Sequence, residues 1–108
     1  MTINIEIVKA TNPEKKCKAI IQQPSGRTKT VQFGQAGASD YTKHKDPERK
    51  QRYLNRHRKN EDWTDHTTAS FYATNILWNK PTITESIKDT NNRFKNLNIK
   101  LKTYICNV

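Results

Sequence analysis

Eight basic side chains lie close together in the chain, between positions 43 and 59. The same segment holds only two carboxylates, Asp46 and Glu48, so it contributes +6 of the formal net charge of +10. If the segment is helical, Arg49, Arg52, Arg56 and Lys59 recur at the spacing of one helix face and form a stripe. A stripe of this kind can follow phosphate groups, and the planar Arg fork binds phosphate oxygens in a bidentate way. The eight residues are Lys43, Lys45, Arg49, Lys50, Arg52, Arg56, Arg58 and Lys59.

Three aromatic residues accompany these cations. Tyr41 precedes the segment and is predicted to join the binding surface, because an aromatic ring among cations can stack on an unpaired base. Tyr53 and Trp63 are expected to anchor the basic helix to the core instead. A solvated helix that only maintains solubility is the competing interpretation, and a membrane surface is disfavoured because the helix lacks an apolar face.

Histidines and carboxylates near the basic segment raise the alternative of a metal-dependent nuclease. No pair of them lies at i, i+4 within one predicted helix, and HExxH is absent. We therefore predict no catalytic residue, no metal ion and no cofactor. Arg56, His57, Glu61 and Asp40 are expected to form a polar network that fixes the preceding loop against the helix.

Composition sets limits on the fold and on the partner. With 108 residues the chain forms one domain, residues 1–108, and its 20 Lys and Arg against 10 Asp and Glu give a pI near 9.8. Such a balance in a small domain is typical of proteins that bind nucleic acids. No apolar stretch reaches the length of a membrane span, and the first residues lack the pattern of a secretory signal, so an intracellular protein without membrane contact is expected.

Hydropathy patterns predict an α+β domain. Alternation of period two predicts a strand at residues 3–7, a hairpin at 17–33 around Pro24-Ser25-Gly26, and a closing strand at 97–106. These strands are expected to form a small antiparallel sheet. The closing strand either joins the sheet beside the first strand or pairs with a second copy, which would make a homodimer.

The helices are expected to cover one face of that sheet. Residues 67–78 are apolar almost all round and predict a buried helix, and the Thr82 to Glu85 capping box starts another helix over 83–94. Asp46-Pro47-Glu48 is a strong helix start, so the basic helix should run from 47 to about 60 on the surface.

An ordered series of uncommon dipeptides between residues 28 and 94 resembles a family of small basic proteins of unknown function from nucleocytoplasmic large DNA viruses. The resemblance implies a viral origin, action inside the infected host cell and association with the virion. It supplies no catalytic residues, and the tail from Asn96 lies outside the shared region. The segments that carry it are Phe33-Gly34, Ser39-Asp40-Tyr41-Thr42, Asp46-Pro47-Glu48-Arg49-Lys50, Leu77-Trp78-Asn79-Lys80-Pro81 and Arg93-Phe94.

The sequence thus predicts a non-enzymatic protein that binds nucleic acid, DNA rather than RNA, mainly through the phosphate backbone. Two alternatives stay open. One is a virion structural or host-protein interaction module whose basic face meets an acidic protein. The other is a small metal-dependent nuclease.

Overall fold

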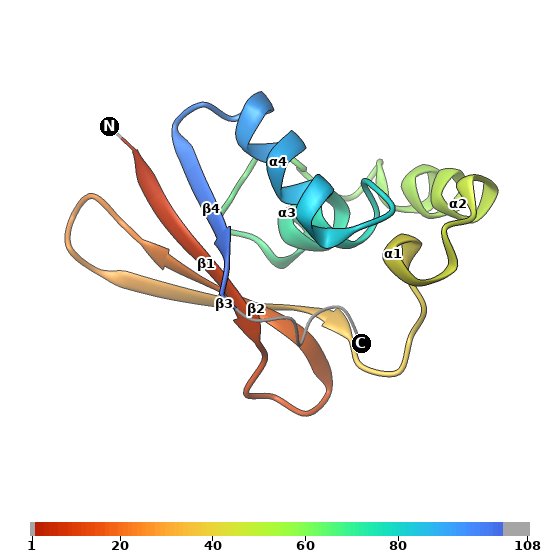
Figure 1. Ribbon diagram of the computed structural model, residues 1–108, viewed down its shortest axis with the longest axis horizontal. Coiled ribbons are helices and arrows are strands. Elements are labelled where there is room, and N and C mark those ends of the chain that lie inside the picture. The colour runs from red at the N-terminus through yellow and green to blue at the C-terminus, as the bar shows by residue number, and fades with distance from the viewer. Residues whose placement is uncertain (1, 103–108) are drawn as a thin grey trace.

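The computed structural model describes residues 2–102. Four strands form one sheet, and the helical segments lie on one side of it and at one end of the molecule (Figure 1). The predicted closing strand is seen as far as Leu101, and its part from residue 103 onward lies outside the described residues. The elements in chain order are β1 (Ile3–Lys9), β2 (Lys15–Gln22), β3 (Thr28–Gln35), α1 (Tyr41–His44), α2 (Pro47–His57), α3 (Ala69–Tyr72), the π-helix η1 (Ala73–Leu77), α4 (Ile83–Arg93) and β4 (Leu97–Leu101).

The α+β class is confirmed, and the strand order is β3-β2-β1-β4. β2 pairs antiparallel with β1 and β3, but β4 pairs parallel with β1, in the register Ile5 opposite Ile99. The expectation of a purely antiparallel sheet was therefore wrong. Alternating hydrophobicity determines which face of a strand is buried but not its direction. That direction is set by α4, which returns the chain to the edge where β1 begins, and there Ile3 N donates to the Asn96 carbonyl at 2.8 Å.

The outer edge of β4 is partly occupied by a side chain of α4. Asn91 Nδ2 donates to the Ile99 carbonyl at 3.0 Å, and Ile99 N donates to Asn91 Oδ1 at 2.9 Å. The amide thus takes the place of a neighbouring strand at this residue, which blunts an edge that could otherwise pair with another chain. A homodimer formed through this strand would first have to displace Asn91.

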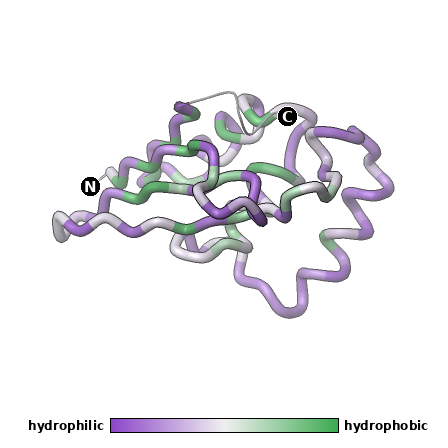
Figure 2. The backbone as a smooth tube through the Cα atoms, turned by 90° about the horizontal axis from the view of Figure 1, so that it is seen from below, coloured by the Kyte–Doolittle hydropathy of each residue, from purple (hydrophilic) through white to green (hydrophobic). Residues whose placement is uncertain are grey.

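The core lies between one face of the sheet and the helices α3, η1 and α4. The period-two residues of the strands supply one half, and the almost wholly apolar segment 71–77 supplies much of the other. Figure 2 shows this contrast, because hydrophobic residues run along the strands while the end that carries α1 and α2 is largely hydrophilic. The fully buried members include Ile5, Ile7, Cys17, Ala19, Ile21, Phe33, Phe71, Tyr72, Ile76 and Leu77.

The predicted buried helix of residues 67–78 is present as two joined pieces, α3 and η1. Thr68 caps the start through its side chain, which accepts from Phe71 N. Further along, Asn75 Nδ2 donates to the Phe71 carbonyl at 2.9 Å, a local bond that competes with the regular backbone ladder. Here the turn widens, and Trp78 N donates to the Ala73 carbonyl five residues back.

Two helices precede this buried segment, and one of them was not predicted. α1 begins where Asp40 accepts from Thr42 N at 2.9 Å, within a stretch that reads as a polar connection. α2 begins as predicted, with Asp46 accepting from Glu48 N and Pro47 in the first turn, but it ends at His57 rather than near Asn60. Within residues 2–102, none of the helices has the length and apolar character needed to cross a membrane.

Candidate nucleic-acid interface

The helices α1 and α2 stand apart from the rest of the fold. We call residues 41–59 the arm, and the sheet with α3, η1 and α4 the body. No residue of α1 or α2 is buried, and α2 lies at the far end of the molecule from the sheet (Figure 1). Because the arm shares no apolar core with the body, it must be held by side chains at its inner surface.

A column of rings joins α2 to the body. Tyr53 stacks on Trp78 with centroids 4.1 Å apart and an angle of 2° between the planes, and His57 stacks on Tyr53 at 4.2 Å. The ring of His44, from α1, lies 5.3 Å from Trp78. Burial raises the pKa of the Tyr53 hydroxyl, as expected of a ring held between two elements. Tyr53 is therefore an anchor of the arm, as its place in the sequence suggested.

Lys50 is a second anchor, although its position in the basic segment predicted that it would bind phosphate. Its Nζ donates to the Asn79 carbonyl at 2.6 Å and lies 5.0 Å from the ring centroid of Tyr41. Burial and the neighbouring Lys80 lower the pKa of Lys50. The ammonium group is thus engaged between arm and body. One face of the half-buried Tyr41 ring is likewise occupied by this cation.

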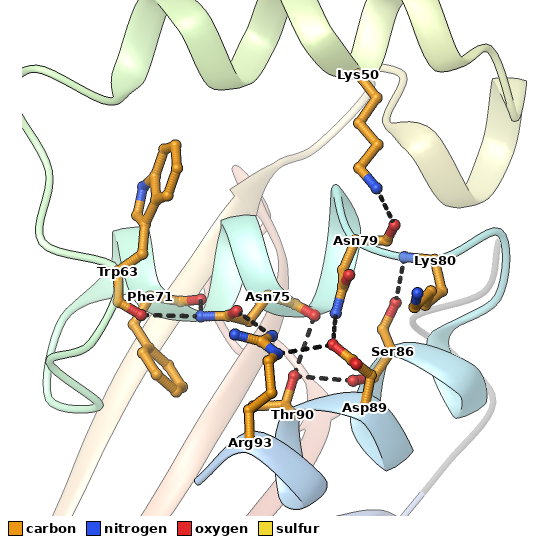
Figure 3. Close-up of polar contacts among 10 residues, drawn as sticks. All are labelled: Lys50, Trp63, Phe71, Asn75, Asn79, Lys80, Ser86, Asp89, Thr90 and Arg93. Carbon is orange, nitrogen blue, oxygen red and sulfur yellow. Dashed lines mark hydrogen bonds and ion pairs between the residues drawn. The ribbon is translucent and has the colours of Figure 1, made fainter.

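Lys50 also connects to a hydrogen-bond network inside the body (Figure 3). Asn79, which accepts from Lys50, donates through Nδ2 to Asp89 at 2.8 Å, and Arg93 donates to the same carboxylate oxygen at 2.8 Å. Arg93 Nη2 also donates to the buried Asn75 at 2.6 Å. The hydrogen bond from Asn79 and the bond and charge of Arg93 lower the pKa of Asp89. The arm is therefore tied to a network that spans η1 and α4.

The other seven predicted cations are exposed. Within residues 2–102 only Arg52 among them forms an ion pair, with Glu48 at 4.0 Å, and both side chains are more than half exposed. An exposed pair of this kind contributes about 0–1 kcal/mol, so a phosphate can replace the carboxylate at little cost. The exposed cations are Lys43, Lys45, Arg49, Arg52, Arg56, Arg58 and Lys59.

These seven cations do not all point the same way. Arg49, Arg52 and Arg56 fall within a band of about 60° around α2, whereas Arg58 lies about 180° from Arg49. Lys43 and Lys45, in and after α1, line two different cavities of about 470 and 480 Å³. Along α2 the predicted stripe is thus limited to Arg49, Arg52 and Arg56, because Lys59, its fourth predicted member, follows the end of the helix at His57. Arg58 and Lys45 lie on other sides of the arm.

A cleft of about 700 Å³ lies between α2 and the body. Arg49 and Arg56 line its wall on α2, and Ala69 and Ala73 line the opposite wall. At its base β3 approaches η1 so closely that a Cβ on Gly34 would lie 2.7 Å from Leu77 Cδ1. Gly34 also has φ +78°, so glycine is required here both by space and by backbone conformation.

Lys15 and Lys16 of β2 belong to this surface but were not predicted. Both line the 700 Å³ cleft and also the adjoining cavity lined by Lys43. Lys16 forms a buried ion pair with Asp40, whereas Lys15 is exposed. The period-two pattern of this segment predicts a strand, but it does not predict that the start of β2 lies beside a helix that begins some thirty residues later.

The predicted polar network is present in part. Glu61 accepts from Trp63 Nε1 at 2.8 Å and pairs with His57 Nδ1 at 2.7 Å, so these three residues fix the chain that leaves α2. Asp40 lies in a separate group, where it accepts from Thr42 and pairs with Lys16. Within residues 2–102, no three His, Cys, Asp or Glu side chains are grouped so that they could hold a metal ion.

No curated protein and no solved structure matches the chain significantly. Over residues 5–57, from β1 to the end of α2, the chain is similar to a family of unknown function, DUF5754. This match shares residues 28–57 with the resemblance seen in the sequence, which spans residues 28–94.

Proposed function

We propose that the protein is a non-enzymatic nucleic-acid-binding protein that binds the phosphate backbone of DNA with little sequence preference. One observation carries the proposal. Seven exposed Lys and Arg side chains of the arm face solvent, and within residues 2–102 a single weak ion pair is their only carboxylate contact. A dense set of unneutralised cations on an anchored helix favours a polyanionic partner.

The arrangement favours backbone contacts over base reading. The cations point to several sides of the arm, and Tyr41, the aromatic residue predicted to stack on bases, has one ring face taken by Lys50. Cations spread in this way neutralise phosphates without selecting a sequence. The resemblance to proteins of large DNA viruses adds the proposal that the DNA is a viral genome, bound in the infected cell or in the virion.

The salt dependence of binding to random-sequence duplex DNA tests the proposal. If about five cations meet phosphates, log K should fall with log[salt] at a slope of about −4 to −5. Replacing Arg49, Arg52 and Arg56 together by Glu should abolish binding while the far-ultraviolet circular dichroism and the melting temperature stay near those of the wild type.

A matched variant controls for net charge. Arg27→Glu, Lys88→Glu and Lys95→Glu change the net charge equally at exposed positions outside the arm, and should preserve most of the binding. Absence of binding by the wild type at about 50 mM salt contradicts the proposal. Equal losses in the two triple variants contradict the assignment of binding to the arm, and unfolding of the arm variant shows that the stripe is structural.

A further inference from the structure

We propose that the cleft between α2 and the body holds one unpaired nucleotide of a bound strand. The protein would then bind DNA that contains unpaired nucleotides more tightly than continuous duplex DNA. This inference rests on the proposed function, because it specifies which form of nucleic acid the same surface prefers.

The size and the walls of the cleft suit a nucleotide. Its volume of about 700 Å³ lies within the range of about 300–1,000 Å³ that small-molecule sites occupy. Ala69, Ala73 and Leu77 give the body side of the cleft apolar surface, and the polar residues Ser39 and Ser70 also line it. A flat base with a polar edge therefore finds both apolar surface and hydrogen-bonding groups in the cleft.

The charges of the cleft suit the phosphates of a strand. Arg49 and Arg56 are exposed, line the same wall and form no ion pair within residues 2–102. They lie about 10.5 Å apart along the axis of α2, so their side chains can reach the phosphates on either side of one nucleotide. Lys15 adds a third exposed cation from the body.

The carboxylates of the cleft do not oppose such a strand, because their partners are already in place. Asp40 pairs with Lys16 and accepts from Thr42. Glu61 accepts from Trp63 Nε1 and is hydrogen-bonded to His57 Nδ1. Neither carboxylate is exposed, whereas the exposed charged side chains of the lining, Lys15, Arg49 and Arg56, are all positive.

The preference for unpaired nucleotides follows from the cost of exposing a base. A paired base must leave its stack to enter a cleft, which costs a few kcal/mol and is least for a base that is already unpaired. When the base is already unpaired, its contacts with the cleft are not spent on breaking a base pair and so add more to the affinity. Single-stranded DNA, or a duplex with a one-nucleotide bulge, should therefore bind about tenfold more tightly than intact duplex.

Fluorescence anisotropy with three labelled DNAs of equal length and at matched salt tests this inference. The probes are a perfect duplex, the same duplex with a one-nucleotide bulge, and one of its single strands. Equal affinity for all three overturns the inference but leaves the proposed function standing. If none of the three binds, the proposed function fails and the inference fails with it.

A substitution that fills the cleft locates the preference. Ala69→Trp places a large ring on the exposed start of α3, inside the cleft, and should reduce bulge and single-strand affinity to the level of duplex while duplex affinity stays unchanged. Ala36→Trp, at an exposed position outside this cleft, is the matched control and should keep the preference. If Ala69→Trp melts early, Ala73→Leu tests the same wall with a smaller side chain.

Two results would overturn the assignment of the cleft. One is a preference for unpaired DNA that survives a folded cleft-filling variant. The other is a free mononucleotide, added as an unlabelled ligand, that binds as tightly as the strand, because the occupant would then be a small nucleotide rather than part of a polymer.

Discussion

The arm and the body of this protein are held together by different forces. The body buries apolar residues from every strand and from three helical segments, and its buried Asn75 is bonded to the Phe71 carbonyl and to Arg93. The arm has no buried residue in either of its helices and is attached by stacked rings and by Lys50. Stability is therefore concentrated in the body, and free positive charge in the arm.

Because stability and charge are separated in this way, substitutions in the two regions should have different effects. Substitutions in the body should lower the free energy of unfolding of the whole domain, because packed apolar contacts there extend across several elements. Substitutions at the arm's attachment should loosen the arm while the sheet stays folded, because regions with few buried contacts open locally. Three experiments, in order of decreasing effect, test how far the two regions are independent.

Truncation of a buried ring in the body should have the largest effect. Phe71 is 0% exposed and packs edge-to-face against Tyr72 and Phe94, with centroids at 4.9 and 5.3 Å. Phe71→Ala should lower the free energy of unfolding by about 3–5 kcal/mol, measured by urea denaturation. A loss below about 1 kcal/mol would mean that the body is not the stable unit assumed here.

Removal of the stacked ring of the arm should have a smaller and more local effect. Tyr53→Ala deletes the ring between Trp78 and His57 and should lower the free energy of unfolding by about 1–2 kcal/mol. In hydrogen exchange the amides of α2 should lose protection, and those of β1 and β2 should keep theirs. Equal loss of protection in α2 and in the sheet would show that arm and body unfold as one unit.

A change of pH should have the smallest effect, and it should act on the arm first. Burial, and next Arg49, lower the pKa of His44 below its usual 6.5, against the opposing effect of Asp46 and Asp40. Since the folded state prefers the neutral ring, the unfolded state binds more protons, and stability falls as the pH drops from about 6.5 through the lower folded pKa. Asp46 N donates to His44 Nδ1 at 2.9 Å, a contact that protonation removes.

The comparison of wild type with His44→Asn measures this contribution. The asparagine side chain can still accept from Asp46 N but does not titrate, so the variant should lose less stability than the wild type between about pH 7 and 5. Hydrogen exchange of α1 and α2 should follow the same trend. Identical pH profiles for the two proteins would show that His44 does not link the arm to pH.

Local patterns were sufficient to predict most of the elements. The alternating residues of β1 to β3, the Asp46 cap of α2 and the Thr82 cap of α4 each act through near neighbours in the chain. The same kind of reasoning missed α1 and the widened turn of η1. In both, a residue that forms a local bond, Asp40 in α1 and Asn75 in η1, is also held by a distant one, through the pairing of Lys16 with Asp40 and the bond from Arg93 to Asn75.

Of the candidate site, the sequence predicted only the concentration of positive charge. The cluster of cations is visible in the sequence because the residues are neighbours. The sequence did not show that Lys50 is withdrawn from the exposed cations or that Lys15 and Lys16 join the surface. Lys50 and Lys16 contact partners 29 and 24 positions away, and Lys15 lines a cleft formed by β2, β3, α2, α3 and η1.

The sequence by itself determined the α+β class, the faces of the strands and the concentration of charge between residues 43 and 59, because periodicity, capping and net charge are local properties. The tertiary structure alone decided that β4 runs parallel to β1, that Lys50 serves as an anchor, and that a cleft opens beside Arg49 and Arg56. These features depend on how α4 and the ring column place distant segments side by side, and packing between distant segments leaves no periodic signal in the chain.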